Sequence, residues 1–290
     1  MSEQNSSGAE IAETTSVPVY AHRQTKLVTL ALSPTAAATF RQCRQLYKFL
    51  YIDRLGDQYS RPRPYFTMAN HVHDTLRDFL KLWPPDLRTP SAVEEIFWKN
   101  WQRYRAGFRN AADEKRWAGK ALAQLRAFVS NQDVTSKPLM MEEFLEAEIT
   151  PGLLLRGRLD RVDQEPGGSL HIIDYKTGNV PPQIDWTQLR MHALILSHCQ
   201  RLPVRRLSYL YLGPSVVESL EISASDLKAT RWEVMALARK VRLERQYLPG
   251  PSPRCGGCDF NPICPRTQPI ESSSAATQGQ LGFWDEFPDW

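Results

Sequence analysis

Residues 157–161 read Gly-Arg-Leu-Asp-Arg, and residues 172–176 read Ile-Ile-Asp-Tyr-Lys. Both stretches lie in β-rich segments, and the Gly167-Gly168 pair between them predicts a tight hairpin turn. Each expected strand ends in an acid, and strand alternation directs the side chains of Asp174 and Lys176 to one face of the sheet. Two carboxylates and a lysine can hold a divalent metal ion and an attacking water against a phosphodiester. The sequence therefore predicts a hydrolytic metal site on a sheet.

Helical and strand patterns surround this hairpin. The Ser33-Pro34 pair is typical of a helix N-cap followed by proline in the first turn. Further helices are expected at 66–82, 91–109, 113–131, 185–198 and 225–247, and further strands at 141–149, 206–212 and 216–222. We expect one α/β domain over residues 27–266, a disordered tail over 1–26, and a linker with an aromatic and acidic tail over 267–290.

Composition narrows the class of protein. The 290 residues are 42% hydrophobic, which is enough for a sizeable core. The 36 Lys and Arg residues, the net charge of +4 and the isoelectric point near 8.8 weakly favour a polyanionic partner. No apolar run approaches the roughly 18 to 20 residues that span a bilayer, and the first residues are polar and acidic, so a cytoplasmic protein without a membrane partner is expected. The sequence has no Gly-x-x-x-x-Gly-Lys-Ser/Thr phosphate loop, so any helicase motor must be another polypeptide.

Three motifs in order carry a family resemblance. Residues 157–163 (Gly-Arg-Leu-Asp-Arg-Val-Asp), residues 172–178 (Ile-Ile-Asp-Tyr-Lys-Thr-Gly) and Gln188-Leu189 resemble the RecB-type branch of the PD-(D/E)XK nuclease superfamily, over about residues 30–266. The resemblance implies a restriction-endonuclease-like core with a mixed central sheet flanked by helices and a helical N-terminal portion. It also implies a Mg²⁺ or Mn²⁺ site made by Asp160, Asp174 and the backbone carbonyl of Tyr175. Lys176 would then orient water or stabilise charge, and Gln188 would support the site.

The same branch has a histidine ligand on an upstream helix. In residues 69–76, Ala-Asn-His-Val-His-Asp-Thr-Leu, the resemblance aligns His73 with that ligand, and His71 is the competing residue. The branch usually has tyrosine four residues after the glutamine, where this chain has His192. Glu143, Glu146 or Glu148 could add another carboxylate, and the sequence does not decide among them.

Cysteines suggest a second site. Cys255, Cys258 and Cys264 share one proline-flanked loop, and three local thiolates leave a tetrahedral or cubane site one ligand short. The segment around Cys43 resembles the one that donates a distant first cysteine in iron–sulfur members of this branch, such as the AddB nuclease domain and the CRISPR-associated RecB-like exonucleases. By resemblance these four cysteines would bind a [4Fe–4S] cluster, with Zn²⁺ as the alternative metal. Cys199 is expected to be a buried or bystander thiol.

Basic and aromatic side chains suggest contacts with DNA. Residues 103–109 carry three arginines on an expected helix rich in Trp and Tyr, although a solvated face with Trp98 and Trp101 in the core is the simpler alternative. Other basic residues that could neutralise phosphates are Arg41, Arg44, Lys48, Arg54, Arg61 and Arg63. Near the C-terminus, Gln280, Leu281, Phe283 and Trp284 resemble peptides that dock on bacterial sliding clamps. Docking of this tail on its own domain is equally compatible with the pattern.

The sequence thus predicts a divalent-metal-dependent DNA nuclease. The resemblance favours an exonuclease that acts on single-stranded or frayed DNA ends in recombination, repair or CRISPR spacer processing. A separate helicase subunit, CRISPR adaptation proteins or a sliding clamp would be its partners. The alternative is a DNA-binding or helicase-partner module that does not cleave and is stabilised by an iron–sulfur cluster or zinc.

Overall fold

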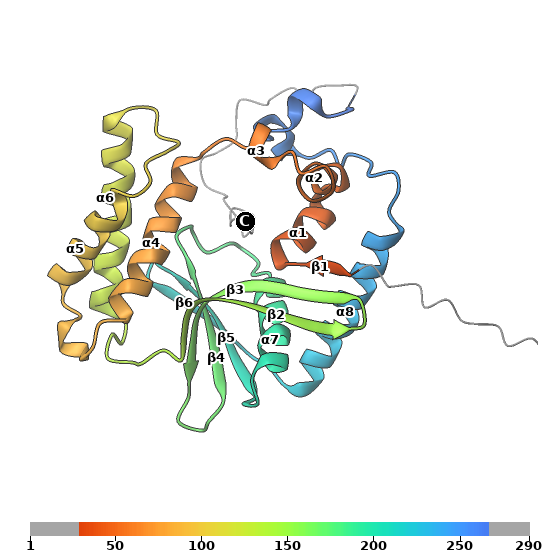
Figure 1. Cartoon of the computed structure of the whole chain (residues 1–290). Helices are drawn as coiled ribbons and strands as arrows, with labels where there is room; N and C mark the ends of the chain where they lie inside the picture. Colours follow the sequence, from red (N-terminus) through yellow and green to blue (C-terminus); the bar gives the residue numbers. More distant parts are fainter. Residues whose placement is uncertain (1–28, 267–290) are drawn as a thin grey trace, which may run out of the picture.

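A mixed β-sheet forms the centre of the computed structural model, which describes residues 29–266 (Figure 1). Its strands are β1 (Leu30–Leu32), β2 (Met140–Thr150), β3 (Leu153–Gln164), β4 (Leu170–Lys176), β5 (Val204–Tyr211) and β6 (Val216–Glu221). The helices are α1 (Pro34–Gln42), α2 (Arg44–Tyr47), α3 (Gly56–Tyr59), α4 (Pro64–Leu80), α5 (Pro90–Trp101), α6 (Ala111–Asn131), α7 (Thr187–Cys199) and α8 (Ala224–Leu243). A π-helical turn, Lys48–Ile52, follows α2, and short 3₁₀ turns are Pro85–Leu87, Pro253–Gly257 and Asn261–Ile263. The α/β fold with a mixed sheet flanked by helices confirms the expected fold class.

Strand β3 organises the sheet. Strand β2 pairs with it antiparallel along its length, so β1 and β4 share the opposite edge of β3. Strand β1 runs parallel to residues 153–155, and β4 runs antiparallel to residues 161–164. Among residues 29–266, no strand therefore pairs with residues 156–160 on that edge. Strand β4 continues into β5, with which it is parallel, and β5 pairs antiparallel with β6.

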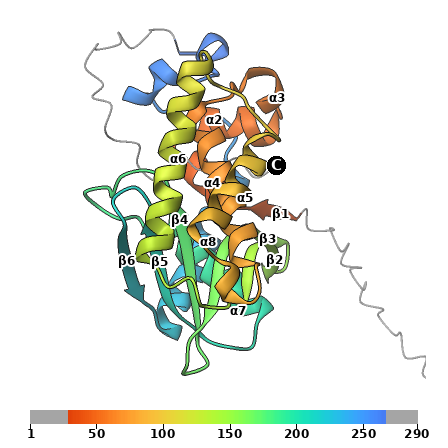
Figure 2. The same cartoon turned by 90° about the vertical axis from the view of Figure 1, so that its left-hand side faces the viewer.

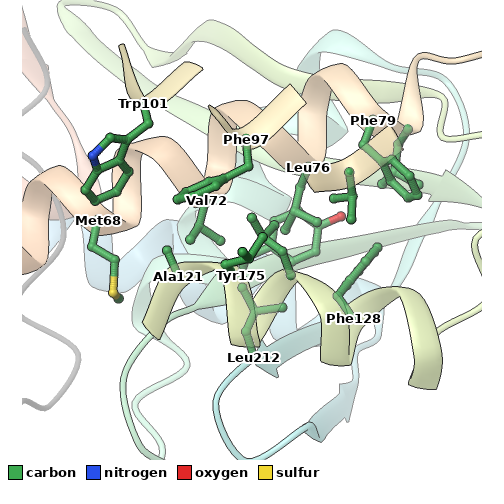
Figure 3. Packing of buried hydrophobic residues seen from close by; sticks show 14 of the residues in the cluster. Met68, Val72, Leu76, Phe79, Phe97, Trp101, Ala121, Phe128, Tyr175 and Leu212 are labelled. Atoms are coloured by element: carbon green, nitrogen blue, oxygen red, sulfur yellow. The ribbon is translucent and has the colours of Figure 1, made fainter. Parts of the chain in front are cut away.

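Helices cover the two faces of the sheet with separate cores. Helices α4, α5 and α6 form one group, seen from its outer side in Figure 2. Their buried side chains enclose the ring of Tyr175 from β4, as Figure 3 shows with Val72, Ala121 and Phe128 around it. On the other face, α1 and α8 pack on α7 and on one end of the β2–β3 ribbon, and α7 also covers β4 and β5. Because Tyr175 is anchored by its side chain, its backbone is fixed between the two cores.

Local signals in the sequence explain most helix starts. Ser33 caps α1 by accepting a hydrogen bond from the backbone N–H of Ala36 at 3.1 Å, as its Ser-Pro pair predicts. Ser223 begins α8 with a capping box whose third residue is Asp226. The hairpin turn between β3 and β4 has Gly168 at a φ of 80°, where glycine carries no Cβ penalty.

Helices α5 and α8 end earlier than predicted, and short elements such as β1 and α3 were not predicted. Helix α5 ends at Trp101, so Arg103, Arg105 and Arg109 are not on a helix. The carbonyls of Tyr104 and Ala106 face donors on α4 instead, which holds this segment outside a helix. Trp101 is buried as expected, but Trp98 is 45% exposed. Strand β1 and helix α3 were missed because three- and four-residue elements carry too little periodicity.

Several predicted DNA contacts are engaged within the protein. Ion pairs join Arg105 to Glu114, Arg109 to Asp113, Arg44 to Glu244, Lys48 to Asp53 and Arg63 to Asp259. Such exposed pairs are weak and can be exchanged for phosphate. The predicted tail peptide with Gln280, Leu281, Phe283 and Trp284 lies outside the described residues. Across residues 29–266, none of the helices has both the length and the apolar character that crossing a bilayer requires.

Candidate metal centre and cysteine site

The candidate metal centre lies where β3 and β4 separate. Arg161 and Ile173 are the last paired residues of this ladder, and Asp160 and Asp174 occupy the next position, where the strands part. The backbone N–H of Tyr175 donates to Asp160 Oδ2 at 2.8 Å, so the carboxylate replaces the ladder bond that is lost. Asp160 and Asp174 are both buried. The two acids of the sequence motif are therefore held at one opening in the sheet.

Glu142 lies across from Asp160 on the other neighbour of β3. Met141 pairs with Arg161 and Glu143 with Leu159, which puts Glu142 opposite Asp160. Its backbone has a φ of 51°, the left-handed region that non-glycine residues rarely adopt. This conformation changes which face the strand presents, because Met141 packs in the α4 core while Ala147 packs in the α7 core. The Glu142 carboxylate is turned inward and is almost fully buried.

The sequence pattern does not indicate Glu142, because a β-bulge changes the register of β2. The turn pair Thr150 and Leu153 would give a register in which Glu143 faces Asp160. A shift between Glu148 and Thr150 moves the pairing by one residue and brings Glu142 there instead. Of the glutamates that the sequence left open, Glu143, Glu146 and Glu148 are exposed on β2. Counting from the turn identifies the right neighbourhood, but no residue pattern signals the bulge.

His73 completes a compact group. Its Nδ1 is 3.1 Å from Glu142 Oε1, and its Nε2 is 3.1 Å from the carbonyl oxygen of Tyr175. One ligand atom each from His73, Glu142 and Asp160 lie within 4.8 Å of one another, the only such group of three among residues 29–266. His71 points elsewhere, with Nε2 at 2.6 Å from the Tyr104 carbonyl and its ring against Trp101. The structure thus brings His73, and not His71, to Asp160.

The charges in this group depend on one another. Burial disfavours the charged imidazole, but the facing carboxylates of Asp160 and Glu142 outweigh it and raise the pKa of His73 well above its usual value. Burial and the Asp160 charge raise the pKa of Glu142. For Asp160, burial is outweighed by the charge and hydrogen bond of His73, so its pKa is lowered. Both ring nitrogens of His73 face acceptors, so the protonated ring can donate to both and offset the negative charge of the carboxylates. A divalent cation bound among the same groups would offset that charge in place of the proton.

Asp174, Lys176 and Gln188 form a neighbouring triangle. Lys176 Nζ is 2.6 Å from Asp174 Oδ1 and donates to Gln188 Oε1 at 3.1 Å. Gln188 Nε2 donates to Asp174 Oδ2 at 3.0 Å. The three sequence-predicted residues are therefore in contact, but Asp174 is not a member of the compact His73 group. The triangle fixes the ammonium and one carboxylate beside the opening that holds Asp160.

His192, a residue of α7, lies against β3 close to the metal centre. Its ring is so close to β3 that a Cβ on Gly157 would be 2.9 Å from Nε2, which explains the glycine of the motif. Its Nδ1 is buried and has no hydrogen-bond partner among the described residues. Burial, with a smaller effect from Lys176, lowers the pKa of His192 to about 4 despite the opposing charge of Asp160. This ring is therefore neutral at physiological pH.

The donor set suits a hard divalent cation. Two carboxylates, an imidazole and a backbone carbonyl are oxygen and nitrogen ligands of the kind that Mg²⁺ or Mn²⁺ accepts. Comparison with known proteins agrees with this chemistry, because the model of the PD-(D/E)XK nuclease superfamily matches residues 31–265. The chain belongs to this superfamily. Membership in the superfamily implies a DNA substrate.

Solved structures provide more distant comparisons for this superfamily member. Among them, 26 chains match. SSO0001 is 17% identical with a TM-score of 0.35, over 69% of this chain and 95% of its own. A protein named as a "putative exonuclease" from Eubacterium rectale is 12% identical with a TM-score of 0.47, over 91% of this chain and 99% of its own. No curated protein matches the chain significantly.

The four predicted cysteines of this PD-(D/E)XK chain meet at a second site. Cys43, Cys255, Cys258 and Cys264 line one small cavity of about 30 Å³, closed by side chains such as Phe49 and Phe260. Burial raises the pKa of the Cys258 thiol, and the nearby Cys255, Cys43 and Cys264 raise it further. Cys199 lies apart, with its thiol near the Glu146 carbonyl on β2. The ends of the domain thus converge on one cluster of sulfurs.

Backbone N–H groups point at these sulfurs. Cys43 Sγ accepts from the N–H of Leu46 at 3.4 Å and of Gly250 at 3.3 Å, and Cys255 Sγ accepts from Ser252 at 3.4 Å. Gly250 is required there, because a Cβ would lie 2.8 Å from the carbonyl oxygen of Gln42. Such N–H···S contacts stabilise thiolates that bind a metal or cluster.

The distances between the cysteine sulfurs bear on whether a zinc ion or an iron–sulfur cluster could bind there. A tetrahedral zinc ion with Zn–S bonds of about 2.3 Å holds its sulfurs about 3.8 Å apart. Within the described residues, no three of the cysteine sulfurs lie within 4.8 Å of one another. In a cubane cluster each thiolate binds a different iron, so the sulfurs are farther apart. The site thus brings four thiols together around one cavity, a donor set that either a cluster or a zinc ion accepts.

The cysteine loop is fastened to the start of α4. Asp259 forms an ion pair with Arg63 at 2.5 Å and accepts from the backbone N–H of Arg61 at 3.0 Å. Phe260 is buried and stacks on Phe49, with ring centroids 5.3 Å apart. Because Arg63 is the N-cap of α4, the cysteine loop holds the end of the helix that carries His73.

Proposed function

We propose that this chain is a divalent-metal-dependent deoxyribonuclease that removes nucleotides from single-stranded or frayed DNA ends. The observation that carries the proposal is the buried group of His73, Glu142 and Asp160 beside the Lys176 ammonium. Membership in the PD-(D/E)XK superfamily supports the hydrolytic chemistry. The resemblance of the sequence to the RecB-type branch supports action on DNA ends, in recombination, repair or CRISPR spacer processing.

The side chains have distinct roles in this proposal. A bound Mg²⁺ or Mn²⁺ would supply Lewis-acid activation of water and neutralise charge on the phosphate. His73, Glu142, Asp160 and the Tyr175 carbonyl would hold the ion, with Asp174 as a further carboxylate. Lys176, fixed between Asp174 and Gln188, would orient the attacking water and stabilise negative charge that develops on the phosphate. Gln188 would position both of these side chains.

The cysteine site would bind a [4Fe–4S] cluster with a structural role. The supporting observations are the four cysteines around one cavity and their N–H···S contacts. Hydrolysis of a phosphodiester transfers no electrons, so the cluster would stabilise the fold. It would do so by closing the long loop between Cys43 and Cys255.

Cleavage of end-labelled single-stranded and duplex DNA with Mn²⁺ or Mg²⁺ tests the nuclease. We expect anaerobically purified wild type to shorten labelled strands, and the product ladder gives its polarity. Lys176→Gln, which removes the charge and keeps most of the side chain, should lower the rate roughly 10²- to 10⁴-fold. Lys99→Gln on the exposed face of α5 is the matched control and should cleave like wild type.

A module that binds DNA without cleaving it is the alternative. It would give tight binding and no product with wild type, Lys176→Gln and Lys99→Gln alike. That outcome would exclude the nuclease and move the proposal to a partner subunit of a separate helicase. Thermal unfolding of each variant, measured in parallel, separates loss of chemistry from loss of fold.

A further inference from the structure

An aromatic and an arginine side chain lie together just outside the metal centre. Phe144 of β2 pairs with Arg158 of β3, two residues from Glu142 and Asp160 on the same two strands. Phe144 is 50% exposed, and the Arg158 side chain is 60% exposed. The exposed phenyl ring can stack on a planar ligand, and the guanidinium can bind an anion.

This pair faces away from the helix that covers the other side of the ribbon. Leu159 clusters with α7 residues, and Gly157 touches His192 of α7. Strand alternation therefore directs Arg158, between them, to the opposite face. The neighbouring edge of β3 is open, because β1 ends its pairing at Leu155 and β4 begins at Arg161. Phe144 and Arg158 thus lie on an exposed part of the ribbon, two residues along the strands from Glu142 and Asp160.

The Arg158 side chain lies near Glu142 of the metal centre and is also exposed on this surface. Its Nη1 is 3.6 Å from Glu142 Oε2, which is an ion pair but too long for a hydrogen bond. Among residues 29–266 the guanidinium has no hydrogen-bond partner. A cation bound by Glu142 would weaken this attraction and leave the planar fork of donors for a phosphate.

We propose that Phe144 and Arg158 form a subsite for an unpaired nucleotide next to the bond that is cleaved. The base would stack on the Phe144 ring, and its phosphate would bind the Arg158 guanidinium. Bases in a duplex are stacked on one another and cannot offer a free face, so the subsite selects single-stranded or frayed ends. This inference rests on the proposed nuclease and names the strand that its site accepts.

Binding to DNA tests the subsite without cleavage. The Lys176→Gln background and Ca²⁺ in place of Mg²⁺ keep the probe intact, and fluorescence anisotropy with a short labelled single strand and a blunt duplex gives both affinities. We expect Phe144→Leu to weaken single-strand binding roughly fivefold to a hundredfold, while Phe144→Trp restores it. Duplex binding should change little, and both variants should melt like wild type because the ring is exposed.

Arg158 is tested by its salt dependence. Arg158→Ala should lower the slope of log K against log salt by about 0.7 for a single strand, because one phosphate contact is lost. Trp232→Leu and Arg126→Ala, an exposed aromatic on α8 and an exposed arginine on α6, are matched controls and should bind like the parent. A 2-aminopurine base near the strand end should be quenched by the parent protein and not by Phe144→Leu.

The outcomes separate this inference from the nuclease. If wild type cleaves and the Phe144 and Arg158 variants bind like the parent, the subsite is wrong and the nuclease stands. If wild type does not cleave but single-strand binding depends on both residues, the subsite stands and the nuclease falls. If the parent binds neither single strand nor duplex, the subsite is wrong, and cleavage by wild type alone decides the nuclease.

Discussion

The metal centre and the cysteine site are built in different ways. The metal centre draws on α4, β2, β3, β4 and α7, and its side chains are hydrogen-bonded to one another and to the backbone at Tyr175. The cysteine site joins Cys43 to a loop more than 200 positions later, and the sulfurs of Cys43 and Cys255 accept hydrogen bonds from backbone N–H groups at 3.3 to 3.4 Å. The first site keeps its shape through its own polar contacts. The second would be held together by the metal group that we propose for its four thiols.

The cysteine site should respond most strongly to the loss of a ligand. Cys258→Ser should lower the free energy of unfolding by about 5 kcal/mol if the cluster acts as one cross-link over this loop. Denaturant unfolding and the visible absorption of the purified protein measure the effect, and Cys199→Ser is the matched control. Wild type without visible absorption but with one zinc ion per chain would contradict the cluster.

At the metal centre, His192 should give the next largest effect, a dependence of the free energy of unfolding on pH. Its pKa falls from 6.5 to about 4 on folding, so the folded state resists a proton that the unfolded state accepts. Stability is therefore present above pH 6.5 and is lost as pH falls toward 4, by about 3 kcal/mol in total. His192→Gln, measured metal-free by denaturant unfolding between pH 7 and 4.5, should show a shallower loss. Parallel curves for the two proteins would show that burial of His192 has no such effect.

The two histidines of α4 are both buried, so replacing each in turn tests whether the metal centre depends on His73 in particular. His73→Asn should weaken Mn²⁺ binding at least tenfold to a hundredfold, because it removes one member of the compact group. His71→Asn should leave Mn²⁺ affinity unchanged, since its ring contacts Trp101 and the Tyr104 carbonyl. Isothermal titration with Mn²⁺ measures both. Equal losses in the two variants would show that α4 contributes through its fold and not through His73.

Replacement of Glu142 should change the free energy of unfolding least. The direction of this change is what the experiment tests. Glu142→Gly removes a left-handed strain of about 1 kcal/mol and a buried carboxylate, so the metal-free protein should become more stable while Mn²⁺ affinity falls. Arg54→Gly, at a φ of 56° on an exposed turn, should gain stability alone. A Glu142→Gly protein that is less stable without metal would mean that the His73 contact outweighs the strain.

Sequence patterns predicted the long elements and the motif residues, and tertiary contacts decided the rest. The β3–β4 hairpin was predictable from its strand patterns and its Gly-Gly turn, and α4 was predictable from its helical periodicity. The register of β2 could not be predicted. A single bulge places Glu142 beside Asp160, where the pairing counted from the turn would place Glu143. The choice of His73 over His71 followed from the motif alone, because both lie on buried parts of the same helix.

The distance in sequence between Cys43 and Cys255 also has a consequence during synthesis. At about 5–20 residues per second, the 212 positions between them (255 − 43) take roughly 10 to 40 s to translate. All residues of the metal centre have by then left the ribosome, while Cys43 still waits for its partners. If the four cysteines bind one metal group as proposed, Cys43 must stay reduced and free of other metals until Cys264 has been translated.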